Sequence, residues 1–472
     1  MKLFSLRLTT LKSKLYAIVF ASFLVRVVVF FALPNTGSNF GPDETNYAGL
    51  TEWIAQSKPA DQYYPYGSLY ITSRSLILPA SILNRAGISG IDSVRITSSL
   101  YSFLTLMLLT FFILYLNHSR LDVAKFILSN EKKVLSLFMV FAFLPSHLIW
   151  SFLGLRESAL EFWVVIVFAL VFYIFELNKK ASKATLFCIG IFIPLVFYSR
   201  PQIGWLLGIT LLTYSLIRIK LKVAKILIPL ILISISLGYI GTTAFSFEST
   251  KSLNAQAKAG SLNVSTQSEY EASKLCRESG SKVEFDGVEY ICVLKKESGI
   301  TGLKNPGSLI IEQADAIPLR NEKNQVGAAS AIRTLQCPNG GESRFDKYFC
   351  ITYRAPYTTF TFLFRPMPGS DVTSTSSLFA ALENVLWLAA FSFVLMMLIR
   401  NRRLAFFSAL VPSLLFFCFY SIAAGAYEGN MGTAFRHKSL ILWVVLLLIA
   451  STIVATQQRK AQQQGISGSS QE

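Results

Sequence analysis

The sequence predicts an all-α polytopic membrane protein with about ten transmembrane helices and a small disulfide-containing extracytoplasmic insertion. Of its 472 residues, 52% are hydrophobic and only 15% are charged, and the mean hydropathy is +0.48. This composition is typical of multi-spanning membrane proteins. The net charge of +17 does not indicate a nucleic-acid partner, because the basic residues fall in short clusters between apolar runs. There they act as topology signals and as contacts for lipid headgroups of the bilayer.

Ten apolar runs separate these clusters. The first follows a short basic N-terminus and could pass for a signal peptide, but no small-residue cleavage site follows it. We therefore expect an uncleaved helix, in which Arg26 faces the protein interior or reaches the headgroups. The expected spans are 15–33, 95–116, 134–151, 158–176, 184–199, 202–217, 226–243, 378–399, 404–424 and 439–455.

Lys and Arg are distributed unevenly between the two sides of this arrangement. With the N-terminus inside, the inner segments hold 20 of them and the short outer connections hold 8. Such an excess marks the cytoplasmic side of a membrane, so we expect both termini there. The segment Leu69–Ile82 is short and interrupted by Arg74 and Pro79. We interpret it as an interfacial or re-entrant helix, because counting it as a span would invert every later loop.

A large polar insertion divides the chain. The expected parts are an N-terminal membrane domain (1–243) with its first outer loop (34–93), the extracytoplasmic insertion (244–377), C-terminal membrane helices (378–455) and a cytoplasmic tail (456–472). Short alternating runs in the insertion, Val283-Glu284-Phe285 and Glu289-Tyr290-Ile291, predict a small β-containing module.

Four cysteines lie in this insertion: Cys276, Cys292, Cys337 and Cys350. Because the extracytoplasmic compartment is oxidising, we expect two disulfides. Of the three possible pairings we favour the sequence-local ones, Cys276–Cys292 and Cys337–Cys350. A zinc site is disfavoured, because the insertion has no Cys-x-x-Cys spacing and no His.

Two adjacent carboxylates, Asp43 and Glu44, follow the first span at the outer mouth of the membrane. Acids at this boundary are costly unless they are solvated or used, which makes the pair a candidate for function. The alternative is structural, because Pro42 and the two acids would suit the first turn of a helix. The residues expected on the same side of the membrane favour the functional interpretation.

Charged residues from four further connections share that outer side. They are Arg156 with Glu157, Arg200, Arg365, and Arg436 with His437. The arginines run against the charge rule, so topology does not explain them. Any one of them could reach the headgroups or pair with Glu157. Guanidinium groups also bind phosphate bidentately, so four arginines from four connections indicate a site for a lipid phosphate or pyrophosphate.

An acid pair beside an arginine cluster suits group transfer from a lipid phosphate. A carboxylate would deprotonate the acceptor hydroxyl while the cations hold the departing phosphate. The chain has no Gly-x-x-x-x-Gly-Lys-Ser/Thr loop and no Gly-x-Gly-x-x-Gly fingerprint, so no nucleotide site competes with this interpretation.

The stretch Phe40-Gly41-Pro42-Asp43-Glu44-Thr45-Asn46-Tyr47-Ala48, after a first span, resembles the first outer loop of the GT-C superfamily of polyprenyl-phosphate-sugar-dependent glycosyltransferases. Tyr64-Pro65-Tyr66-Gly67 and Val94-Arg95-Ile96 are similar to the continuation of that loop, and the resemblance covers about residues 15–116. Later motifs, such as Phe364-Arg365-Pro366, resemble those of uncharacterised membrane proteins of bacterial surface-polysaccharide systems.

The resemblance implies that Asp43 is a general base and that Glu44 orients the acceptor or helps to bind a divalent metal ion. No cofactor is certain, and the sequence offers no dedicated set of metal ligands. The expected substrate-binding residues are Arg156, Glu157, Arg200, Arg365, Arg436, His437, Tyr47 and Tyr64. A lone His is more often packed than functional, and tyrosines in this loop could instead be interfacial anchors.

Three functions remain open at this point. The first is a glycosyltransferase that moves a sugar from a polyprenyl-phosphate donor to a glycan, lipid or protein acceptor at the extracytoplasmic face, in cell-surface glycan assembly. The second is an O-antigen or exopolysaccharide polymerase or ligase. The third is a flippase or transporter of lipid-linked sugars, which should show internal repeats and broken spans in both halves. The sequence shows neither.

Overall fold

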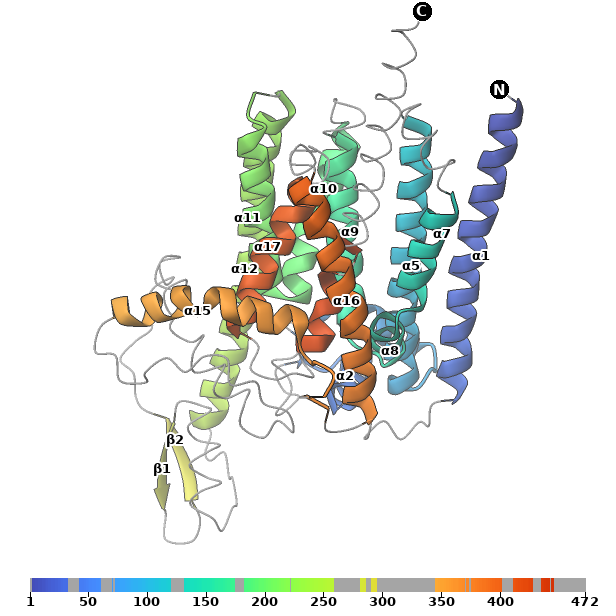
Figure 1. Ribbon diagram of the computed structural model, residues 1–472. Coiled ribbons are helices and arrows are strands. Elements are labelled where there is room, and N and C mark those ends of the chain that lie inside the picture. The colour runs from blue at the N-terminus through green and yellow to red at the C-terminus, as the bar shows by residue number, and fades with distance from the viewer. Residues whose placement is uncertain are drawn as a thin grey trace, which may run out of the picture.

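The computed structural model of the chain is predominantly helical (Figure 1). It describes residues 2–32, 42–60, 70, 73–119, 131–174, 182–220, 222–258, 281–285, 290–294, 344–369, 371–372, 375–400, 411–427, 434–441 and 443–444. Long helices stand side by side, and α15 lies crosswise to them (Figure 1).

The helices are α1 (Lys2–Ala32), α2 (Pro42–Ala55), α4 (Arg74–Arg85), α5 (Gly90–Ser119), α7 (Glu131–Phe143), α8 (Pro145–Phe152), α9 (Glu157–Phe172), α10 (Lys183–Ser199), α11 (Pro201–Ile217), α12 (Lys222–Lys258), α15 (Arg344–Phe364), α16 (Thr375–Arg400) and α17 (Val411–Tyr427). Residues 434–441 form a further helical segment. Two strands, β1 (Ser281–Phe285) and β2 (Tyr290–Leu294), pair antiparallel, with Val283 opposite Cys292.

Within the described part of the chain, three helices are long and apolar enough to cross a membrane. They are Thr10–Ala32 of α1, Gly90–Phe111 of α5 and Lys222–Ile240 of α12. Only 28% of the α1 span and 33% of the α12 span are buried within the chain, so most of their apolar surface needs another environment. A lipid bilayer provides it. The fold is therefore compatible with a membrane protein, as the sequence predicts.

The expected span 134–151 is broken in two. The helices α7 and α8 are bent by 43° at Leu144, and together they make a fourth candidate span if the pair is counted as one. Leu144 is extended, with φ −60° and ψ 129°. The cause is Pro145, because the ring of a proline disfavours the helical conformation in the residue before it.

Among the described residues, helices that are long and apolar enough to cross a membrane are fewer than the ten spans that the sequence predicts. Further apolar helices, at Lys183–Ser199, Pro201–Ile217, Leu378–Ser392 and Val411–Ala426, overlap four expected spans but have at most 17 residues each. A bilayer requires roughly 20 helical residues. The ten-span topology therefore stays a prediction. The segment that we interpreted as interfacial or re-entrant forms α4, whose 12 residues are too few for a span.

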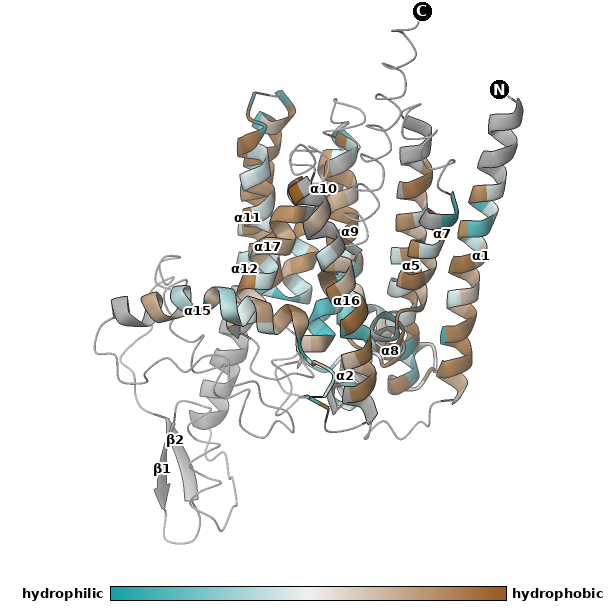
Figure 2. Ribbon diagram, viewed as in Figure 1, coloured by the Kyte–Doolittle hydropathy of each residue, from teal (hydrophilic) through white to brown (hydrophobic). Residues whose placement is uncertain are grey.

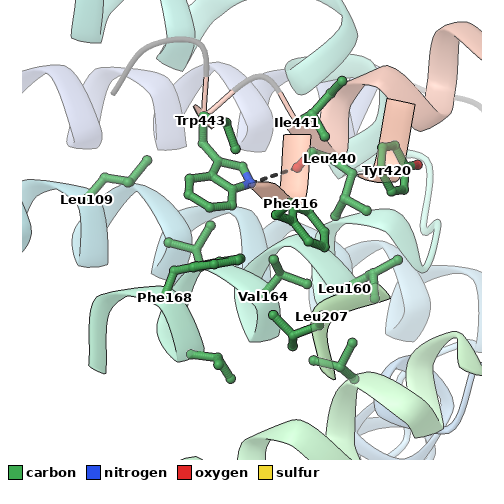
Figure 3. Packing of buried hydrophobic residues seen from close by; sticks show 14 of the residues in the cluster. Leu109, Leu160, Val164, Phe168, Leu207, Phe416, Tyr420, Leu440, Ile441 and Trp443 are labelled. Atoms are coloured by element: carbon green, nitrogen blue, oxygen red, sulfur yellow. Dashed lines mark hydrogen bonds between the residues drawn. The ribbon is translucent and has the colours of Figure 1, made fainter. Parts of the chain in front are cut away.

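The largest hydrophobic core packs α9 against its neighbours (Figure 3). Val164 and Phe168 of α9 are buried against α11 and α17, which contribute Leu207 and Phe416. Trp443, after the segment 434–441, lies over Phe168, and its Nε1 donates to Leu440 O at 2.7 Å. This core fixes the C-terminal segment against the middle of the chain. Apolar residues follow the upright helices, whereas hydrophilic residues gather beside α16 and α8 (Figure 2).

The insertion contains more helix than its polar composition suggests. We expected it to begin at residue 244, but α12 continues to Lys258 and α15 occupies Arg344–Phe364. The antiparallel pair β1–β2 agrees with the predicted β-containing module. Cys350 is disulfide-bonded, whereas Cys276 and Cys337 lie outside the described residues. The expected disulfide pairs therefore stay predictions.

Cysteines introduced at Ile300 and Gly465 test the predicted topology. In intact cells, a membrane-impermeant maleimide should label the residue at 300 and not the one at 465, because the Lys and Arg excess places both termini inside. The native Cys188 and Cys418, which are free, should be replaced by serine beforehand. Labelling at 465 but not at 300 would place the candidate site described below on the cytoplasmic side.

Candidate functional site

A buried carboxylate, Glu157, begins α9 and lies at the centre of the candidate site. Its side chain is only 4% exposed. Arg436 Nε lies 3.1 Å from Glu157 Oε1, and His437 Nε2 lies 3.7 Å from the same oxygen. Both partners belong to the helical segment 434–441. The structure therefore brings a connection near the C-terminus onto the connection between α8 and α9.

Arg200 joins this cluster through the imidazole of His437. It is extended between α10 and α11, because Pro201 disfavours a helical conformation in the residue before it. Its Nη1 is hydrogen-bonded to His437 Nε2. A guanidinium group can only donate, so Nε2 accepts and the neutral ring carries its proton on Nδ1. The hydroxyl of Tyr420 donates to the backbone carbonyl of His437 at 3.1 Å and holds this turn in place.

The charges around Glu157 leave an excess of positive charge. Burial by itself raises the pKa of Glu157, but its interactions with the charges of Arg436, Arg156 and Arg200 lower the pKa to about 2. The carboxylate is thus ionised at neutral pH and holds several guanidinium groups close together. Three arginines against one carboxylate suit an anionic ligand such as phosphate. We call Arg156, Glu157, Arg200, Arg436 and His437 the arginine cluster.

Arg365 lies outside the arginine cluster as an ion-pair partner of Asp371. Its Nε donates to Asp371 Oδ2 at 2.8 Å, and its Nη2 binds the other oxygen. The same carboxylate accepts from the backbone N–H of Met367 at 2.8 Å. The structure therefore assigns Arg365 a role in the turn after α15. It does not bring this side chain to Glu157, as the sequence-based expectation would require.

A buried lysine that sequence reasoning missed connects this turn to the arginine cluster. Lys438 is 3% exposed and follows His437 directly. Its Nζ donates to Asn384 Oδ1 at 2.8 Å, to Leu363 O at 3.2 Å and to Arg365 O. The lysine thereby fixes the end of α15 to α16. Its position next to His437 could have indicated this role. From the sequence alone, we instead counted Lys438 only among the Lys and Arg residues of the outer connections.

The carboxylate Glu44 is fully engaged by Arg95. Arg95 Nε donates to Glu44 Oε1 at 2.6 Å and Nη2 donates to Oε2 at 3.2 Å, and both side chains are at most 2% exposed. The pair joins α2 to the start of α5. This favours the structural alternative for Glu44. Asp43 lies in the first turn of α2, as the helix-start alternative expects, but its side chain is outside the described residues.

The two predicted tyrosines differ in what the structure shows. Tyr47 is 2% exposed and packs in a second core with Ala48, Leu76 and Val94. It is placed to stabilise α2 rather than to meet a substrate from solvent. Tyr64 lies outside the described residues.

The segment before Glu157 links the arginine cluster to the α2–α5 region. A Cβ added to Gly154 would lie 2.8 Å from Val94 Cγ2 and 3.3 Å from Arg95 N, and its φ of +63° also favours glycine. Ser98 on α5 donates to Leu155 O at 3.0 Å. The connection that carries Glu157 is therefore packed directly on α5, the helix whose Arg95 binds Glu44. The two predicted halves of the site are neighbours.

A second buried polar group lies where α1, α8 and α9 meet. Arg26 donates to Ser151 Oγ and Ser102 Oγ, both at 2.9 Å, and to His147 Nδ1 at 3.0 Å. Because Arg26 only donates, His147 carries its proton on Nε2, which lies 3.2 Å from Glu161 Oε2. Arg26 thus faces the interior, as one of its two predicted interpretations states. The contacts to His147 and Glu161 could not be read from spacing.

No group of three His, Cys, Asp or Glu side chains that could hold a metal ion occurs in the part of the chain that the structure describes. Glu44 fits a metal poorly, because coordination would break its ion pair with Arg95.

No protein-family model, curated protein or solved structure matches this chain. What the chain does must therefore be inferred from the site itself.

Proposed function

We propose that this chain is an integral membrane glycosyltransferase, resembling the GT-C superfamily, that transfers a sugar from a polyprenyl-phosphate donor to a glycan, lipid or protein acceptor. The reaction takes place at the extracytoplasmic face of the bacterial cytoplasmic membrane and serves cell-surface glycan assembly. The arginine cluster binds the phosphate of the donor, and Asp43 deprotonates the acceptor hydroxyl.

The main support for this proposal is that three arginines, Arg156, Arg200 and Arg436, come together around Glu157. These residues come from three connections that are far apart in the sequence, and the fold assembles them around one buried carboxylate. A cluster with excess positive charge stabilises the phosphate that departs when the sugar leaves. Glu157 holds the guanidinium groups in position, so they need little rearrangement when the donor binds.

The ion pair between Glu44 and Arg95 separates the roles of Asp43 and Glu44. Because Arg95 occupies both of its oxygens, Glu44 positions α2 and the proton transfer falls to Asp43. We derive no step through a metal ion, since the described side chains include no group of three His, Cys, Asp or Glu that could hold one.

Conservative replacements in the arginine cluster test the binding of the donor. Arg200→Lys and Arg436→Lys keep the charge but lose the planar fork that matches a phosphate. A hydrogen bond to a charged group contributes about 1.5–3 kcal/mol, so we expect the affinity for polyprenyl phosphate to fall about 10- to 100-fold. Titration of purified protein in nanodiscs with polyprenyl phosphate measures this.

Arg85→Lys is the matched control for these variants. Arg85 is exposed and donates to the backbone oxygen of Ala55 at 3.0 Å, outside the arginine cluster. Its replacement should leave the affinity unchanged. Equal affinities for all four proteins would rule out the arginine cluster as the phosphate site.

The second candidate is an O-antigen or exopolysaccharide polymerase or ligase. The ion pair of Glu44 with Arg95 favours it, because one of the two predicted catalytic carboxylates is occupied by another residue. Such an enzyme would use the outer arginines and need no contribution from Asp43. An Asp43 variant, treated in the Discussion, separates the two candidates.

A further inference from the structure

The helix α15 crosses the upright helices instead of running along them (Figure 1). It packs on α17 near the last turn of that helix. A Cβ added to Gly425 would lie 2.8 Å from the backbone of Thr358, so no larger residue fits at the crossing. Since α17 is apolar from Val411 to Ala426, α15 crosses it where its apolar stretch ends.

One face of α15 is buried, and the side chains on the opposite face are exposed. Thr358, Thr361 and Phe362 are at most 2% exposed on the side that meets α17. The other side carries a row of aromatic residues at helical spacing. These are Phe349 (63% exposed), Tyr353 (77%), Tyr357 (57%) and Phe360 (48%). We call these four residues the aromatic row.

Exposed apolar surface on α17 extends up to the point where α15 crosses it. Ile422 lies one turn before Gly425 on α17 and is 48% exposed. An exposed apolar side chain on an apolar helix is a surface for the acyl chains of a bilayer. Tyrosine, by contrast, is enriched at the boundary between acyl chains and headgroups, and phenylalanine is common on the apolar face of helices that lie in this boundary. The helix α15 crosses α17 at the end of its apolar stretch, which is where this boundary would lie. The tyrosines of the aromatic row suit that position.

We propose that α15 is an in-plane amphipathic helix whose aromatic row lies in the interfacial region of the membrane. The partner of this surface is the lipid bilayer, at the end of the apolar stretch of α17. The inference uses only the placement of α15 and the exposure of its side chains, so it is independent of the proposed enzymatic activity.

The inner end of α15 is fixed to the rest of the chain. Lys438 donates to Leu363 O at 3.2 Å and to Arg365 O, and Arg365 is held by Asp371. The helix is therefore a rigid extension of the turn next to His437. An amphipathic helix that is held in this way sets the depth of the adjoining site relative to the headgroups.

Photocrosslinking tests this placement. The photoreactive residue p-benzoylphenylalanine replaces Tyr353 or Tyr357 in the full chain, reconstituted in nanodiscs of phosphatidylcholine and phosphatidylglycerol. Ile233 of α12, which is 57% exposed within a candidate span, is the reference for lipid contact. Arg354 is the matched control, because it lies at the same position along α15 and is less exposed.

We expect phospholipid adducts, measured by mass spectrometry, at 353 and 357 in yields comparable to that at 233 and severalfold above that at 354. Absence of adducts at 353 and 357, with normal yield at 233, would overturn the proposal. The same variants irradiated in whole cells distinguish a protein partner. Adducts of protein mass at 353 instead of lipid adducts would show that another protein covers the aromatic row, which also contradicts the proposal.

Discussion

Replacing Asp43 by asparagine is expected to reduce sugar transfer by about 10²–10⁴-fold, the usual cost of losing general-base catalysis. The amide has nearly the same size as the carboxylate, so expression and binding of polyprenyl phosphate should stay close to those of the unchanged protein. The measurement is the rate of transfer in a reconstituted system, or complementation of a deletion strain, together with the binding titration.

Glu52→Gln is the control for this variant, because it removes a carboxylate from the same helix. Glu52 accepts from Gly90 N at 3.0 Å and has no part in the proposed site. It should keep near-normal transfer. If Asp43→Asn also kept near-full activity while Arg200→Lys and Arg436→Lys lost it, Asp43 would not be the base. The polymerase or ligase would then be the better assignment.

Replacing Glu157 by glutamine is expected to destabilise the fold strongly. The change leaves Arg156, Arg200 and Arg436 close together without the carboxylate that holds them. Removing one member of a buried ion pair typically costs about 3–5 kcal/mol, because the remaining charge is buried without compensation. Thermal unfolding in detergent, followed by intrinsic fluorescence, should show a clear fall in the melting temperature. Glu131→Gln, which breaks the more exposed pair with Lys14, should cost less than about 1 kcal/mol.

The same variant should change how stability depends on pH. The pKa of Glu157 is lowered from 4.5 to about 2 in the folded chain, so its contribution is complete above about pH 4.5. That contribution is lost as the pH falls toward 2, when the carboxylate takes up a proton. Between these values, the melting temperature of Glu157→Gln should fall less steeply than that of the unchanged protein. Equal slopes would mean that Glu157 is not held ionised by the arginines.

The helical class and the grouping of Glu157, Arg200 and Arg436 were predictable from the sequence. Apolar runs indicate helices, and the excess of Lys and Arg on one side left the outer arginines unexplained. The break between α7 and α8 was also readable in principle, since Pro145 stands in the middle of the expected span 134–151. Sequence reasoning gave the length of the apolar run more weight than the proline.

The pairing of individual side chains could not be predicted. The engagement of Glu44 by Arg95 depends on how α2 packs on α5, and no local pattern encodes that distance. The pairing of Arg365 with Asp371 depends on the turn between them. The helix α15 was hidden because its aromatic row alternates with threonines in a segment that is polar overall. A search for helical spacing at 349, 353, 357 and 360 would have found it.

The assembly of the arginine cluster has a consequence for the biosynthesis of the chain. Arg200 and His437 are 237 positions apart. At about 5–20 residues per second, roughly 10–50 s of translation separate the two. During that interval Glu157 is already made, but Arg436 and His437 are still absent. A nascent chain that stops before residue 434 therefore lacks the Arg436 guanidinium that lies 3.1 Å from Glu157 and the His437 ring to which Arg200 is hydrogen-bonded. The helical segment 434–441 thus completes a site that begins in the first half of the protein.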